Sequence, residues 1–215
     1  MSSQLVPILD EFMQTVDTVY GVYLDSTTGY KWAKERLEQA QQNSLEMFNK
    51  EKGEDWTLED LDAKSMAYGR RDPNTSEAEV IHKGTQLQFK QRNSHGGLNF
   101  KVIGNLCAVL LYQYWENHYR PQIGKLRQVP SNEVQFDVMG DLRHIRSSII
   151  HHRAIALPEI DKCVILKWFT EGDEIIFAET QFDELVRLIK RGIDEMASDQ
   201  SAEADQKAEP ETPAE

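Results

Sequence analysis

The segment that most constrains the fold is the stretch between Ile103 and Trp115, which is hydrophobic nearly all the way round a helix. A helix without a polar face is buried on most of its sides, so other helices must pack around this one. The longest unbroken apolar run, Leu106 to Leu111, is far shorter than the roughly 20 residues that span a membrane. We therefore expect a central core helix and no transmembrane segment.

The first 50 residues predict two amphipathic helices. Apolar side chains recur at steps of three and four over residues 5–23, behind Ser2 or Ser3 as an N-cap. A similar spacing returns over residues 28–49. Two consecutive amphipathic helices of this length are typical of an antiparallel helical hairpin.

Further helices are predicted downstream. The apolar helix covers about 98–120, and Pro121 ends or kinks it because proline lacks an amide N–H. A short basic continuation and then a helix over about 133–153 follow. The last helix is capped at Thr180, with Asp183 three residues on. Six of its side chains are expected to face the core: Phe182, Leu185, Val186, Ile189, Ile193 and Met196.

The remaining segments lack a long helical period. Residues 51–97 predict an irregular excursion with one short helix after Thr57. Two β-prone runs, 163–169 and 174–177, flank a turn and predict a small hairpin before the last helix. Residues 198–215 have nothing to bury and predict a disordered acidic tail. The expected fold is thus mainly all-α, a single helical domain over 1–197.

Charge is unevenly distributed along the chain. Lys and Arg number 24 against 36 Asp and Glu, a formal net charge of −12 that argues against coating nucleic acid by bulk charge. Between residues 118 and 153, however, Lys and Arg outnumber acids, and four of the six histidines lie there. This segment can hold a phosphate at one place, although a solvated helix face is the common alternative.

The N-terminal residues do not suggest a secretory signal, and the two cysteines do not suggest a metal site or a disulfide framework. No Lys or Arg precedes Lys31 and acidic residues interrupt the apolar positions, so a secretory signal is not expected and the cytoplasm is the predicted location. Cys107 and Cys163 do not have the spacing of a metal site or a disulfide framework.

The candidate chemistry lies on the helix that ends near Arg153. With about 100° per residue, Leu142, Ile145 and Ile149 fall on the side expected to face the core. Arg146 falls at the edge between the two sides. The opposite side carries four polar side chains: Arg143, His144, Ser147 and His151.

Arg146, Ser147 and His151 resemble the motif of the HEPN superfamily, whose ribonuclease members carry Arg, a small polar residue and then His near the end of one helix. The upstream segment 112–120 resembles the Tyr-x-Tyr-Trp-Glu segment of HEPN-like nucleases, in which the acid, here Glu116, points toward the same cleft. The resemblance covers about residues 98–153. It implies a HEPN-like helical bundle and a homodimer whose motif helices face each other across a shared cleft.

The resemblance also implies RNA cleavage without a metal or another cofactor. Attack of a ribose 2′-hydroxyl on the adjacent phosphodiester needs proton transfer and charge stabilisation. Histidine transfers protons near neutral pH, which suits His151. A planar guanidinium holds two phosphoryl oxygens, which suits Arg146. Glu116 completes the expected catalytic set, with Ser147, Arg143, His144 and His152 as supporting candidates.

Each candidate residue also has a purely structural interpretation. His151 can bond a carbonyl at the helix C-terminus, and Arg146 can pair with Asp137 or Asp141. Glu116 can simply hold Arg120 one turn on. A zinc site built from His144, His151 and His152 is not expected, because adjacent histidines diverge around a helix.

Two function classes follow. The first is a HEPN-type endoribonuclease, a toxin or defence effector that cuts RNA under the control of an antitoxin or another regulatory protein. The second is a non-catalytic HEPN module that dimerises and binds a nucleotide or a protein partner. Ser147 and the acidic chain favour the second class, since the nucleases most often have Asn, Asp or His at that position; Arg146, His151 and Glu116 together favour the first.

Overall fold

A computed structural model describes residues 2–51, 53, 55–71 and 78–206. These residues fall into two compact units, one formed by the N-terminal residues up to Leu24 together with the chain from Ile103 onward, the other by Asp25–Val102. Helix dominates both units, so the mainly-α prediction is confirmed. The single domain over 1–197 stays a prediction.

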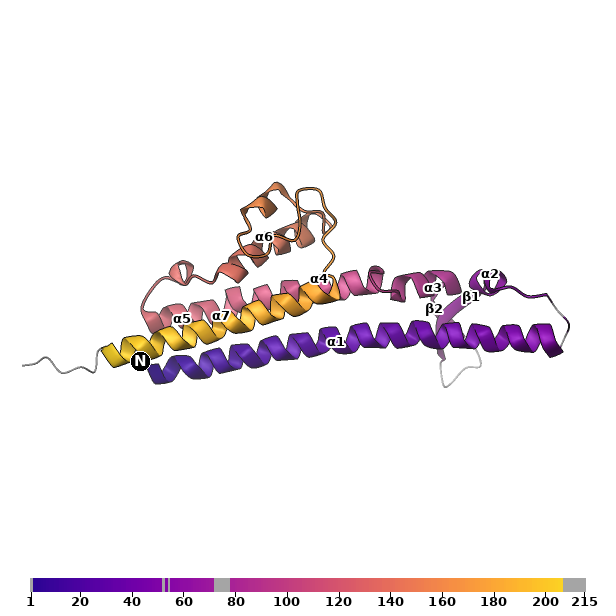
Figure 1. The fold of residues 1–215 in the computed structure, drawn as a ribbon, viewed down its shortest axis with the longest axis horizontal. Helices are drawn as coiled ribbons and strands as arrows, with labels where there is room; N and C mark the ends of the chain where they lie inside the picture. Colours follow the sequence, from indigo (N-terminus) through magenta and orange to yellow (C-terminus); the bar gives the residue numbers. More distant parts are fainter. Residues whose placement is uncertain (1, 52, 54, 72–77, 207–215) are drawn as a thin grey trace, which may run out of the picture. The chain divides into compact units, whose positions relative to one another are not determined.

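The helices and strands follow one another along the chain in a fixed order (Figure 1). They are α1 (Ser2–Glu46), the π-helix η1 (Met47–Glu51), α2 (Leu58–Asp62), β1 (Ser65–Arg71), β2 (Ala78–Thr85), α3 (Gln86–Asn93), α4 (Leu98–Tyr114), the π-helix η2 (Trp115–Tyr119), α5 (Arg120–Arg127), the 3₁₀-helix η3 (Ser131–Glu133), α6 (Asp137–His151), the 3₁₀-helix η4 (Pro158–Lys162) and α7 (Glu179–Gln206).

The predicted N-terminal helical hairpin is wrong, because α1 runs unbroken through the expected connection. The residues at that point are polar, which suggests a loop, but they include no proline. Thr27 lies there with 1% of its surface exposed, so the position is packed in the helix. A polar residue in a helix costs a few tenths of a kcal/mol, and packing readily offsets that.

The first unit packs α1, α4 and α7 around one aromatic core (Figure 1). The ring of Phe12 stacks on Tyr119 at 4.5 Å between centroids, and Tyr23 stacks on Phe182 at 4.0 Å. All six α7 side chains expected to face the core are buried. Gly192 lets α7 approach closely, since a Cβ there would lie 2.2 Å from the ring of Phe136.

The central helix continues past Pro121 instead of ending there. A π-helical turn at Trp115–Tyr119 separates α4 from α5, and Pro121 falls in the first turn of α5. Because proline cannot donate the helical hydrogen bond, the wider turn immediately before it accommodates the missing bond. Proline thus changes the helical register without breaking the helix.

The second unit is more regular than the predicted excursion. The expected short helix is α2, whose N-cap Thr57 forms a capping box with Asp60. Strands β1 and β2 pair antiparallel and α3 follows directly. A buried polar network holds the unit together: Gln41 donates to Asp62 at 2.7 Å, and Lys90 lies 2.5 Å from the same carboxylate.

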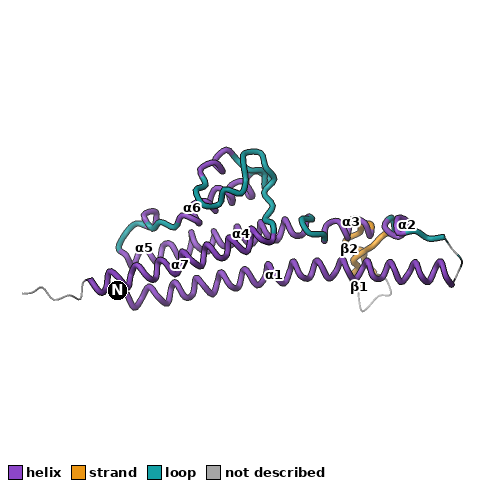
Figure 2. Tube along the Cα trace, viewed as in Figure 1, coloured by secondary structure: helices purple, strands orange, loops and turns teal. Residues whose placement is uncertain are grey.

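Two predictions near the C-terminus need correction. The hairpin expected over 163–177 is a loop with one isolated bridge between Ile155 and Glu174, and Figure 2 draws this segment mostly as loop. Its irregular path follows from hydrogen bonds that the Asp141 carboxylate accepts from the 164–166 backbone. The tail predicted from residue 198 is helical as far as Gln206, and residues 207–215 lie outside the described part.

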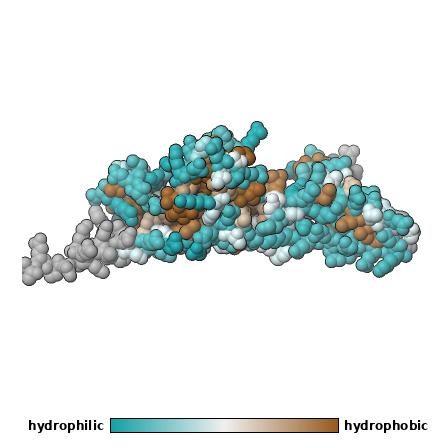
Figure 3. All heavy atoms as spheres, turned by 45° about the horizontal axis from the view of Figure 1, so that its top comes forward, coloured by the Kyte–Doolittle hydropathy of each residue, from teal (hydrophilic) through white to brown (hydrophobic). Residues whose placement is uncertain are grey.

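The surface drawn in Figure 3 is mostly hydrophilic, with hydrophobic residues reaching it in patches. Among the described residues, no helix is both long enough and apolar enough to cross a membrane.

Candidate functional site

Helix α6 presents two different faces. Leu142 and Ile145 are fully buried, and Ile149 is half-buried, as the periodicity predicts. Arg143 and His151 are exposed on the other side. Ser147 and His144 are half-buried there, and Arg146 lies half-buried at the edge. Every member of the predicted stripe therefore lies off the buried face.

A buried carboxylate fixes α6 to the segment that follows η4. Asp141, 3% exposed, accepts hydrogen bonds from the backbone N–H groups of Val164, Ile165 and Leu166 at 2.6 to 3.0 Å. Successive amides that converge on one carboxylate form a small anion nest. Asp141 is thus fully engaged, which removes it as the ion-pair partner considered for Arg146.

Arg146 packs on an aromatic ring of α4. Its guanidinium carbon lies 5.8 Å from the centroid of Tyr112, within the range of a cation–π interaction. Its Nε is buried and has no hydrogen-bond partner. No ion pair of Arg146 is found in the described part of the chain. The guanidinium is therefore positioned by packing while hydrogen-bonding capacity remains unused.

Tyr112, the ring that this arginine contacts, lies next to Glu116. Burial raises the pKa of Tyr112, the charge of Glu116 and a hydrogen bond with it raise that pKa further, and the charges of Arg143 and Arg120 oppose the increase. Glu116 also accepts a hydrogen bond from Arg120 at 2.9 Å. The structural interpretation of Glu116, an i,i+4 partner of Arg120, is therefore present in the structure.

Arg120 links this cluster to the connection before α6. Besides Glu116, its guanidinium donates to the carbonyl oxygens of Val134 at 3.2 Å and Asn132 at 3.1 Å. These bonds tie the η3 segment to the central helix just before α6 begins. They help to set where α6 lies against α4.

The two histidines at the end of α6 point to solvent. His151 and His152 are both exposed, and among the described residues neither ring has a hydrogen-bond or ion-pair partner. Among the described residues, the His151 ring therefore makes no hydrogen bond to a carbonyl oxygen. His151 follows Arg146 by five positions, which places them about 7.5 Å apart along the axis and about 140° apart around it.

The chain leaves α6 through a strained turn. Arg153 and Ala154 have φ values of 54° and 64°, the left-handed region that side chains other than glycine rarely adopt. The turn is held by Ser148, whose carbonyl accepts from His152 and Ala154 and whose hydroxyl accepts from Leu157 at 3.0 Å. Strain of this kind clusters at functional sites.

His144 lies half-buried on the polar stripe of α6. Its pKa is lowered, first by partial burial and then by the positive charges of Arg143 and Lys162. At neutral pH its ring is therefore mostly uncharged.

The structure thus brings together one part of the predicted site and separates another. Tyr112 joins the two helices: its ring contacts Arg146 of α6, and the charges of Glu116, Arg120 and Arg143 act on its hydroxyl. His151 lies apart from this cluster within one chain.

Sequence reasoning placed Tyr112 in the apolar helix and did not find its contact with Arg146. It also missed that Asp141 anchors the 164–166 backbone. A charged residue next to the side of α6 that faces the core could have indicated this.

Within the described ranges, no group of three or more His, Cys, Asp or Glu side chains is arranged to hold a metal ion. Comparison with family models, with curated proteins and with solved structures finds no match for this chain.

Proposed function

We propose that this protein is a metal-independent endoribonuclease of the HEPN type. The observation that carries the proposal is the polar stripe of α6. It combines a guanidinium with an unpartnered Nε, Arg146, with a solvent-facing imidazole, His151. The resemblance to HEPN nucleases assigns these two residue types to one reaction; His151 faces solvent, and Arg146 is half-buried with its Nε inside the protein.

The reaction requires no external nucleophile. The ribose 2′-oxygen attacks phosphorus, the bond from phosphorus to the 5′-oxygen breaks, and the products are a 2′,3′-cyclic phosphate and a 5′-hydroxyl. One proton leaves the 2′-hydroxyl and one reaches the departing oxygen, and His151 has the chemistry for either transfer. Arg146 stabilises the extra negative charge on the phosphoryl oxygens.

Glu116 has a positioning role in this scheme. Its pairing with Arg120 engages the carboxylate, and its negative charge opposes the effect of Arg120 and Arg143 on the Tyr112 hydroxyl. Without an acid here, three guanidinium groups would gather around Tyr112. We therefore assign proton transfer to His151 and organisation of the arginines to Glu116.

The separation of His151 from Arg146 within one chain favours a homodimer, as the resemblance implies. Two copies with facing α6 helices would place both polar stripes along one shared cleft. We further propose a cytoplasmic toxin or defence effector, held in check by an antitoxin or another regulatory protein.

A non-catalytic nucleotide-binding module is the second candidate. The observation that favours it is the engagement of Glu116 by Arg120, which leaves the cluster suited to hold a phosphate but without a free acid. Such a module would bind a nucleotide through Arg143 and Arg146 and leave RNA intact.

The test is cleavage of RNA by the purified protein in excess chelator. We expect wild type to cut RNA, to leave DNA of the same sequence intact, and to produce cyclic phosphate ends. His151→Ala and Arg146→Ala should each reduce the rate by on the order of a hundredfold or more.

His152→Ala is the matched control, because this residue is also exposed but lies about 100° round the helix from His151. It should retain most of the activity, and circular dichroism should show all three variants folded. Equal cleavage by wild type and both site variants, or a requirement for added magnesium, would refute the proposal. Nucleotide binding without cleavage would establish the second candidate.

A further inference from the structure

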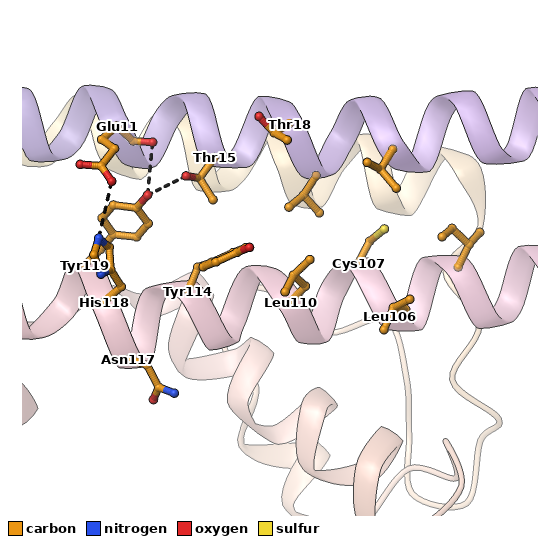
Figure 4. A pocket seen from close by; sticks show the side chains of 13 residues that line it. Glu11, Thr15, Thr18, Leu106, Cys107, Leu110, Tyr114, Asn117, His118 and Tyr119 are labelled. Atoms are coloured by element: carbon orange, nitrogen blue, oxygen red, sulfur yellow. Dashed lines mark hydrogen bonds and ion pairs between the residues drawn. The ribbon is translucent and has the colours of Figure 1, made fainter.

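A groove of about 590 Å³ lies between α1 and the α4–η2 helix (Figure 4). Its floor includes Val19, Ile103 and Cys107, which are buried. Along its edges, apolar side chains face solvent: Leu106 is 57% exposed and Val22 is 52% exposed. Exposed apolar side chains gathered along one groove are typical of an interaction surface.

The groove is almost free of charge. Of its lining residues, Glu11 carries a charge and His118 is titratable, and these two face each other at one end, 3.5 Å apart. At the same end Thr15 and Tyr119 share a hydrogen bond of 2.6 Å. These four polar side chains therefore pair with one another at one end, and Leu106, Cys107 and Leu110 line the groove farther along.

We infer that this groove is a self-association surface, occupied by the α4 helix of a second copy of this chain. Charge is the first argument. Each chain carries a net charge of −12, so two copies repel each other over most of their surfaces. An uncharged apolar strip is a surface on which two such chains can meet without placing like charges in contact.

Shape is the second argument. Leu106, Leu110 and Tyr114 follow one another at four-residue steps and form an exposed ridge beside the groove. A ridge of this spacing fits a groove between helix side chains, with a crossing angle of about −50°. Because one surface carries both the ridge and the groove, two copies related by a two-fold axis can each insert the ridge into the groove of the other.

The size of the strip suits such a contact. From Ile103 to Tyr119 it extends about 24 Å along the helix, and two helices of about 10 Å diameter line it. A strip about 24 Å long and about 20 Å wide has a footprint of about 480 Å² on each partner, or roughly 1,000 Å² in total, which is the low end of the range for specific interfaces.

This surface is separate from the polar stripe. Leu110 and Tyr112 lie about 200° apart around α4, so the ridge and the contact with Arg146 occupy opposite sides of the helix. A groove contact therefore leaves the α6 stripe uncovered, and it forms independently of any contact between α6 helices.

The test is the mass of the full-length chain by light scattering and sedimentation at micromolar concentration. Leu106→Glu and Val22→Glu place a charge in the proposed contact from two different helices. Each should weaken association by about a hundredfold or more, because a buried unpaired charge has no compensation. Val164→Glu is the control: Val164 is 69% exposed and does not line the groove.

The proposal is supported if both groove variants have a smaller mass than wild type and Val164→Glu does not, with unchanged circular dichroism for all variants. A wild-type dimer that becomes a monomer places the dimer contact at the groove, and a larger assembly that becomes a dimer indicates a second contact elsewhere. A monomeric wild type, or groove variants with the wild-type mass, overturns the proposal.

Discussion

Removing the Asp141 carboxylate should release α6 from the segment that follows η4. In Asp141→Ala, three backbone N–H groups lose their acceptor, those of Val164, Ile165 and Leu166. A hydrogen bond to a charged group contributes about 1.5–3 kcal/mol. The cost of each lost bond then depends on whether water can replace the carboxylate.

The exposure of each residue determines how much free energy is lost when its amide loses the Asp141 carboxylate. Leu166 is fully buried, so its N–H stays unsatisfied at a cost of about 2 kcal/mol. Val164 and Ile165 are exposed, so water can reach their amides and each loss is nearer 1 kcal/mol. Relief from burying a charge offsets part of the sum. We therefore expect the free energy of unfolding to fall by about 3 kcal/mol.

Urea unfolding at pH 7, followed by circular dichroism, measures this change. Asp137→Ala is the matched control, because it removes an exposed carboxylate from the first turn of the same helix and should cost less than about 1 kcal/mol. Hydrogen exchange at the Leu166 amide should accelerate in Asp141→Ala alone. Equal stability of the two variants would show that the carboxylate does not anchor this segment.

Three further predictions concern packing, backbone and thiol chemistry. Gly192→Ala should destabilise the protein by about 1–3 kcal/mol in a melting experiment, because its methyl group would collide with the Phe136 ring, and Phe136→Ala should recover part of the loss. Gly140→Ala should stabilise α6 by about 0.5–1 kcal/mol, since nothing lies within 4 Å of the added Cβ; a lower melting temperature would contradict this. Burial raises the pKa of Cys107 to about 11 and of Cys163 to about 12, so both stay protonated thiols at pH 8. Alkylation by iodoacetamide, followed by mass spectrometry, should be slow in the folded protein and fast in urea, and equal rates would refute the assignment.

The sequence by itself determined the elements whose signal is local. The α7 side chains from Phe182 to Met196 recur with the helical period, so their burial followed from spacing alone. The side of α6 that carries Leu142 and Ile145 followed in the same way. Helix α2 was predictable because Thr57 caps its own first turn.

Tertiary structure decided the features that depend on residues distant in the sequence. Polar residues near Thr27 suggest a loop locally, but packing keeps α1 continuous. Residues 163–169 have the composition of a strand, but Asp141 takes the backbone N–H groups that a strand would have used. The contact of Arg146 with Tyr112 joins positions 34 residues apart in the sequence. Sequence periodicity indicates the face of a helix on which a side chain lies. The residue that it contacts depends on how the helices pack, and helix packing depends on the whole chain.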